Sequence, residues 1–232
     1  MSAVTPEKTP MRRVYVWELP VRLTHWVMAV AIIVLAVTGY YIGHPFISVP
    51  GAAKDHFVMG TMRAVHLYAA FVFIAALLVR FYWLFAGNAY ARLGELVPFS
   101  PRRFRSILHA FLFYAFWRRD PDDYPGHNAL AGTTYAAIYA IYVVMIVTGL
   151  VLYAAGAPPD SPFHGLERLA PWLYGLPMTR LIHHVGLWII AIFVVFHVYF
   201  VLLASIIEHT GTMDSIFSGY KFVAKREPSG RD

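Results

Sequence analysis

Long runs of apolar residues, separated by shorter polar segments, dominate this chain. Four of them have about the 20 mainly apolar residues that a helix needs to cross the hydrocarbon core of a bilayer. These runs cover residues 24–42, 64–86, 130–155 and 181–207. A patch at 107–117 is too short to span and is flanked by arginines, which favours a helix lying in the membrane interface. A second short amphipathic helix is expected at 163–174.

Composition excludes a soluble protein. Hydrophobic residues make up 59% of the 232 residues and charged ones only 14%, whereas soluble domains carry about 25% charged residues. The chain has no cysteine, which removes disulfides, iron–sulfur clusters and covalently attached c-type haem. We therefore predict an all-α membrane protein, a four-transmembrane-helix bundle forming a single domain over residues 1–232.

The basic residues predict an orientation. Fourteen lysines and arginines lie in the two terminal segments and the central connection, against four in the other two connections. Cytoplasmic loops carry the excess of positive charge, so we expect both termini and the central connection, with its interfacial helix, in the cytoplasm. The net charge of +6 is then a matter of topology, and no nucleic-acid partner is expected.

Five histidines, His25, His66, His183, His184 and His197, lie within or at the edge of the apolar runs, where an ionisable side chain is costly and marks a function. His66 and His183 each open a helix that returns from the outer side. His25 opens a helix that starts at the cytoplasmic side, and His197 lies deep in the last helix. These four therefore fall at two levels, outer and inner.

Spacing decides between the neighbours His183 and His184. His183 and His197 are 14 residues apart, about 40° short of four full turns, so they share one helix face about 21 Å apart along the axis. His184 is expected to point elsewhere. Pairing by level joins His66 with His183 and His25 with His197, and two neutral imidazoles are what a six-coordinate haem iron needs.

Structural histidines are the alternative for each of these side chains taken singly, but four at matched depths favour a cofactor. Zinc is disfavoured because its ligands cluster. Arginines support haem, since a guanidinium on the ligand's face can pair with a propionate. They are Arg22, Arg63 and Arg180, each three residues before His25, His66 and His183 respectively. Arg80, fourteen residues after His66, could serve the inner level or extend to the membrane surface.

A triplet recurs near the outer ends of the first and third runs, at Val37–Gly39 and Val147–Gly149. Small residues at such points let helices, or a flat cofactor, approach closely. Ordinary helix packing explains the triplets equally well.

Several further segments resemble one family, the cytochrome b subunits of membrane-bound, uptake-type nickel–iron hydrogenases. The resemblance runs from Val14 to about Tyr220. The segments are Trp17–Trp26, Val37–Gly43, Arg80–Trp83, Gly87–Asn88, Gly126–Asn128, His183 and His197–Tyr199.

The resemblance implies a di-haem b protein of the bacterial cytoplasmic (inner) membrane, with the same two histidine pairs. It implies a partner, the iron–sulfur small subunit of a hydrogenase facing the periplasm, and through it the nickel–iron large subunit. The chain would pass electrons to a membrane quinone and would not itself split hydrogen. Related formate dehydrogenase cytochromes suggest a quinone site at His127 and Asn128, although these residues could instead cap a helix.

Two alternatives remain open at this point. The same bundle could serve a formate dehydrogenase or a thiosulfate reductase. A haem-free transporter could use the histidines as a proton or metal path.

Overall fold

The computed structural model describes residues 11–47, 57–96, 101–115, 117, 129–208 and 210–224. Its elements, in chain order, are β1 (Met11–Tyr15), α1 (Leu19–Gly43), α2 (Val58–Ala86), α3 (Leu93–Leu96), α4 (Pro101–Tyr114), α5 (Ala129–Ala154), the 3₁₀ helix η2 (His164–Leu173), α6 (Gly175–Glu208), α7 (Thr212–Ser218) and β2 (Tyr220–Ala224). Within the described part of the chain, α1, α2, α5 and α6 are long and apolar enough to cross a membrane. The prediction of a helical protein with four spans is confirmed.

Three of the four long helices begin about one and a half turns earlier than predicted. α1 starts at Leu19, α2 at Val58 and α6 at Gly175. Pro20 and Pro177, which look like loop residues in the sequence, both fall in the first turn. Proline is tolerated there because the first amides of a helix have no intrahelical acceptor.

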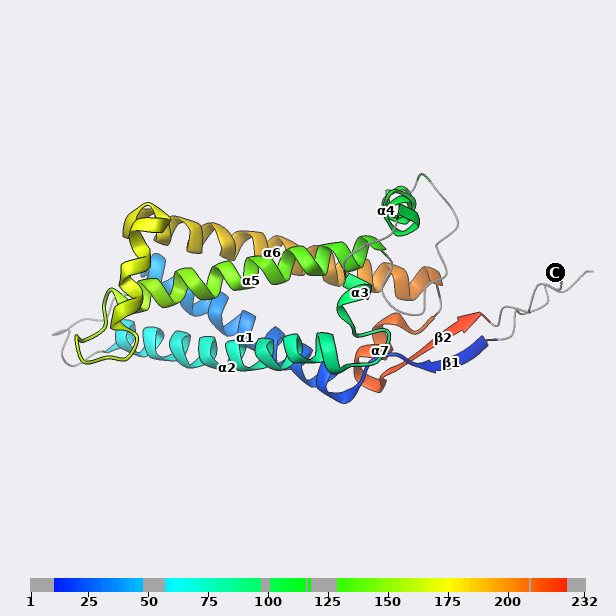
Figure 1. Cartoon of the computed structure of the whole chain (residues 1–232), viewed down its shortest axis with the longest axis horizontal. Helices are drawn as coiled ribbons and strands as arrows, with labels where there is room; N and C mark the ends of the chain where they lie inside the picture. Colours follow the sequence, from blue (N-terminus) through cyan, green and yellow to red (C-terminus); the bar gives the residue numbers. More distant parts are fainter. Residues whose placement is uncertain are drawn as a thin grey trace, which may run out of the picture. The chain divides into compact units, whose positions relative to one another are not determined.

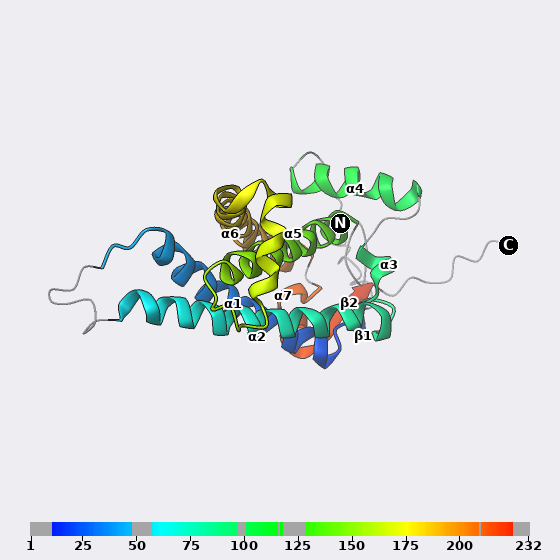
Figure 2. The same cartoon turned by 60° about the vertical axis from the view of Figure 1, so that its left-hand side comes forward.

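The chain divides into two compact units, of which the second contains residues Leu23–Tyr82 and Tyr135–His197. In it the four long helices lie side by side (Figures 1 and 2). A core of mostly apolar side chains joins them, including Met28, Phe73, Tyr142 and Ile190. Large apolar residues such as Ile33, 64% exposed, cover the outside of the bundle, which suits a lipid environment.

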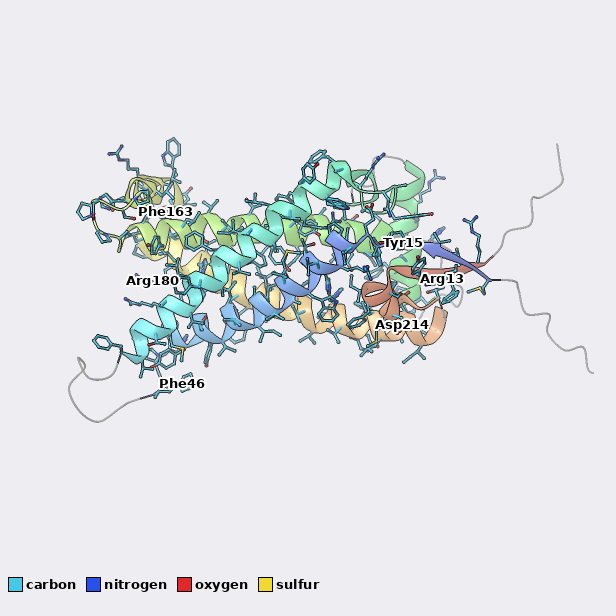
Figure 3. All side chains as sticks on the ribbon, turned by 90° about the horizontal axis from the view of Figure 1, so that it is seen from below. Arg13, Tyr15, Phe46, Phe163, Arg180 and Asp214 are labelled. Atoms are coloured by element: carbon cyan, nitrogen blue, oxygen red, sulfur yellow. The ribbon has the colours of Figure 1, made fainter. Side chains whose placement is uncertain are left out.

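The first unit contains residues Met1–Arg22, Trp83–Thr134 and Val198–Asp232. Here β1 and β2 pair antiparallel, with Met11 opposite Ala224 and Tyr15 opposite Tyr220. The guanidinium carbon of Arg13 lies 3.7 Å from the centre of the Tyr220 ring, and Figure 3 shows Arg13 and Tyr15 on their strand. This small sheet was not predicted from the sequence, because its five-residue strands lie at opposite ends of the chain.

Polar contacts hold three separate segments of the first unit together. The Glu18 carboxylate accepts hydrogen bonds from the Trp83 indole N–H and from the backbone N–H of Asn88, both at 2.8 Å. The Asn88 side chain donates to the Val16 carbonyl at 3.0 Å. The Trp17 indole donates to the Ser215 hydroxyl at 3.0 Å. We call this set of contacts the terminal clasp.

The connecting helices fall close to their expected places. α4 overlaps the apolar patch at 107–117, and its location in a membrane interface stays a prediction. The outer connection carries η2, a 3₁₀ helix that ends at Tyr174 in a left-handed conformation (φ 58°).

Candidate functional site

The second unit brings the four predicted histidines together in two pairs. The ring centres of His66, near the start of α2, and His183, in α6, are 6.4 Å apart. The ring centres of His25, near the start of α1, and His197, further along α6, are 6.3 Å apart. His183 and His197 therefore each meet a partner from the face that their spacing assigns to them.

These separations are too long for a direct hydrogen bond between the two rings of a pair. Two imidazoles binding one metal from opposite sides have ring centres about 6.3 Å apart, because each metal–nitrogen bond is about 2.0–2.1 Å long and each nitrogen lies about 1.1 Å from its ring centre. A direct hydrogen bond between the rings would reduce this to about 5.1 Å. Both observed values are longer than a direct hydrogen bond between the rings allows and are compatible with a shared metal ion.

Threonine hydroxyls hold the His66–His183 pair. Thr38 Oγ1 lies 2.9 Å from His66 Nδ1, and Thr148 Oγ1 lies 2.9 Å from His183 Nδ1. Both threonines are buried, at 5% and 1% exposure. Both triplets can be seen in the sequence, but their threonines were not predicted as site residues.

The glycines that follow the threonines allow the imidazoles to lie against the neighbouring helix. A Cβ atom on Gly39 would lie 3.1 Å from His66 Cε1, and one on Gly149 would lie 3.1 Å from His183 Cε1. Any larger residue would crowd the ring. The small residues of the repeated triplet thus make room for the histidine side chains.

Aromatic rings surround the His25–His197 pair. Phe193 stacks on His197 with ring centres 5.5 Å apart, and the Tyr135 ring lies 6.0 Å from His197. His25 Nδ1 is buried and has no hydrogen-bond partner among the described residues. This pair therefore has different surroundings from the other one.

His184 makes a separate contact. Its Nδ1 lies 2.8 Å from the Arg180 carbonyl oxygen of its own helix, and its Nε2 would lie 2.6 Å from a Cβ atom on Gly43. It does not join the two pairs.

The predicted arginines lie in three kinds of environment. Arg63 and Arg180 are exposed, and Figure 3 shows Arg180 directed away from its helix. Arg80 is only 4% exposed. Arg22 donates from Nη1 to the Phe217 carbonyl, while its buried Nε has no partner within the described residues.

The predicted quinone residues, His127 and Asn128, lie outside the described residues. Their role stays a prediction.

Comparison with known proteins shows the family of this chain. The family described as prokaryotic cytochrome b561 matches residues 16–219. The chain belongs to this family. A b-type cytochrome carries haem b, so membership removes the alternative of a haem-free transporter, and with four spans it indicates a multi-pass protein of the bacterial inner membrane.

Individual relatives of this cytochrome carry a more specific name. A "Probable Ni/Fe-hydrogenase B-type cytochrome subunit" of Rhizobium leguminosarum bv. viciae is 38% identical over 220 residues, covering 92% of this chain and 91% of the relative. One from Bradyrhizobium diazoefficiens is 40% identical over 212 residues, covering 89% and 85%. The "Probable Ni/Fe-hydrogenase 1 B-type cytochrome subunit" of Escherichia coli (strain K12) is 35% identical over 211 residues, covering 89% and 90%.

Proposed function

We propose that this cytochrome is the di-haem membrane subunit of a nickel–iron hydrogenase, and that it carries electrons from a periplasmic iron–sulfur subunit to a membrane quinone. The observation that carries the proposal is the pair of ring separations, 6.4 and 6.3 Å, at two levels of one helical unit. The names of the relatives support a hydrogenase partner.

His66 with His183 would hold one haem b, and His25 with His197 would hold the other. Bound there, haem b supplies a one-electron carrier at each level. The two levels are about 21 Å apart along α6, so they divide the hydrocarbon core of about 30 Å into short steps.

Burial and neighbouring dipoles tune each level separately. The His66–His183 pair has hydroxyl partners, whereas the His25–His197 pair is surrounded by aromatic rings. This difference in polarity gives the two levels different reduction potentials.

Arginines complete the haem sites in this proposal. Arg22 lies one helical turn before His25, and its unpartnered Nε is a donor of the kind that a propionate needs. Arg80 is the buried candidate from α2, and Arg63 and Arg180 are candidates at the other level.

Quinone reduction is placed on the cytoplasmic side, next to the His25–His197 level, with His127 and Asn128 as hydrogen-bond donors to the quinone carbonyl. Both termini and the central connection lie in the cytoplasm, as the distribution of lysine and arginine indicates. The His66–His183 level then faces the periplasmic partner.

A spectroscopic experiment on the purified complex tests this function. Hydrogen gas should reduce the b-type absorption band when the nickel-containing partner is present, and only slowly or not at all without it. In His66→Ala, hydrogen-dependent quinone reduction should stop while the partner still reduces artificial dyes. A band that formate reduces and hydrogen does not would contradict a hydrogenase partner.

A further inference from the structure

Two threonine–histidine contacts repeat across the second unit with the same atoms and the same distance. Thr38 on α1 meets His66 on α2, and Thr148 on α5 meets His183 on α6, both at 2.9 Å between Oγ1 and Nδ1. In each case an outgoing helix supplies the threonine and the next long helix supplies the histidine. A contact that occurs twice in one chain is less easily explained as accidental packing.

Each threonine hydroxyl donates its only proton to a backbone carbonyl of its own helix. Thr38 Oγ1 donates to the Val34 carbonyl at 2.7 Å, and Thr148 Oγ1 donates to the Val144 carbonyl at 2.7 Å. A hydroxyl has one proton and two lone pairs, so the oxygen can only accept from the histidine. The proton of each neutral imidazole is therefore on Nδ1, and Nε2 has a free lone pair.

The glycines fix which edge of each ring faces the threonine helix. His66 Cε1 and Nδ1 are the ring atoms nearest to Gly39, at 3.1 and 3.6 Å from the position of its absent Cβ. At Gly149 the nearest atom is again Cε1, of His183, at 3.1 Å. Glycine and threonine thus act together, one by admitting the ring and the other by orienting it.

We propose that Thr38 and Thr148 are positioning residues that select the tautomer and the orientation of His66 and His183, so that both Nε2 atoms are presented to one iron. This inference rests on the proposed haem ligation. The same hydrogen bonds make the ligands more basic, which favours the oxidised iron and lowers the reduction potential at this level. At the other level, His25 Nδ1 has no such acceptor among the described residues.

Isosteric substitution separates the effect of the hydroxyl from the effect of the side-chain shape. Thr38→Val and Thr148→Val keep the β-branched form and remove the acceptor, whereas Thr38→Ser and Thr148→Ser keep the hydroxyl. Thr179→Val is the matched control. Its residue is fully buried on α6, and its hydroxyl donates to the Gly175 carbonyl at 2.9 Å in the same back-bonded way.

The measurement is a redox titration of the purified cytochrome, followed by its absorption band and by electron paramagnetic resonance. The transition belonging to His66 and His183 is the one lost in His183→Ala. We expect both valine variants to raise the potential of that transition and change its resonance, with a larger shift in the double variant. The serine variants and Thr179→Val should match the wild type.

The results that would contradict this inference differ from those that would contradict the proposed function. An unchanged potential in the double valine variant, or a shift of the other transition only, would overturn the role of the threonines while leaving haem ligation intact. A wild-type protein with no b-type band would overturn the proposed function itself, and the inference with it.

Discussion

A hydrogen-bond partner stabilises a buried imidazole, and His66 and His183 have the same kind of partner. One nitrogen of each contacts a threonine hydroxyl, which leaves the other for a ligand on the facing side. His184, one residue away from His183, satisfies its Nδ1 at a backbone carbonyl instead. The difference between neighbouring histidines is therefore a difference in hydrogen-bond partners.

Replacing His183 and His184 in turn tests this distinction. His183→Ala should remove one of two haems, because one axial ligand is lost, and should leave the His25–His197 level intact. His184→Ala should leave haem content unchanged. Haem per polypeptide, measured by extraction, provides the comparison; a haem lost in His184→Ala would contradict the assignment of helix faces.

The glycines offer a second test with a steric basis. Gly39→Ala and Gly149→Ala place a Cβ atom 3.1 Å from a histidine ring carbon, so the ring must shift and haem occupancy at that level should fall. Alanine itself favours a helix over glycine by about 0.5–1 kcal/mol, so the helix should not unfold. Gly60→Ala on α2 is the control, since its nearest atom is at 3.9 Å; equal haem loss there would contradict the steric argument.

At the scale of elements, the unit is built from two similar helix pairs, α1 with α2 and α5 with α6. Counting from the threonines, His25 on α1 corresponds to Tyr135 on α5. Counting from the two histidines that open the returning helices, Arg80 on α2 corresponds to His197 on α6. The two helix pairs are thus equivalent at the His66–His183 level and different at the His25–His197 level. At the second level, Tyr135 and Arg80 occupy the positions that histidines would occupy if the two helix pairs were identical.

The terminal clasp is also an arrangement of elements, and Glu18 is its hub. Glu18→Ala leaves the Trp83 indole N–H and the backbone N–H of Asn88 without this acceptor. The free energy of unfolding should fall by about 1–3 kcal/mol. The thermal midpoint of the detergent-solubilised protein should fall by several degrees, while haem content at room temperature stays near two per chain. Glu167→Ala removes a partner from the exposed pair with His164 and should change stability by less than about 1 kcal/mol; equal effects would argue against the clasp.

At the scale of the whole molecule, pairing of β1 with β2 carries topological information. Strands joined by hydrogen bonds must lie on the same side of a membrane, so the number of spans between Tyr15 and Tyr220 is even. This agrees with four spans and is independent of hydropathy. The distribution of lysine and arginine predicts that this side is the cytoplasm.

Reporter fusions test the orientation. Alkaline phosphatase needs disulfides, which form in the periplasm and not in the cytoplasm. Fused after Ala224 it should be inactive, and inserted after Pro158 it should be active. The opposite pattern would reverse the bundle and move the proposed quinone site to the other side.

The four spans and both histidine pairs could be predicted from the sequence, because apolar length and the helical repeat act within single segments. The threonine contacts could not, since Thr38 and Thr148 differ from other helical threonines only in what the next helix brings beside them. The small sheet could not be predicted either, because it depends on two strands some 200 residues apart. The early starts of α1 and α6, at Leu19 and Gly175, were not predicted because Pro20 and Pro177 look like loop residues.

The central claim is that paired imidazoles hold haem at two levels of one chain. The most direct test is the ratio of non-covalently bound haem b to polypeptide in the purified wild-type protein. We expect two haems per chain, with two reduction potentials in a redox titration. A ratio of one or zero in fully loaded protein would contradict the claim.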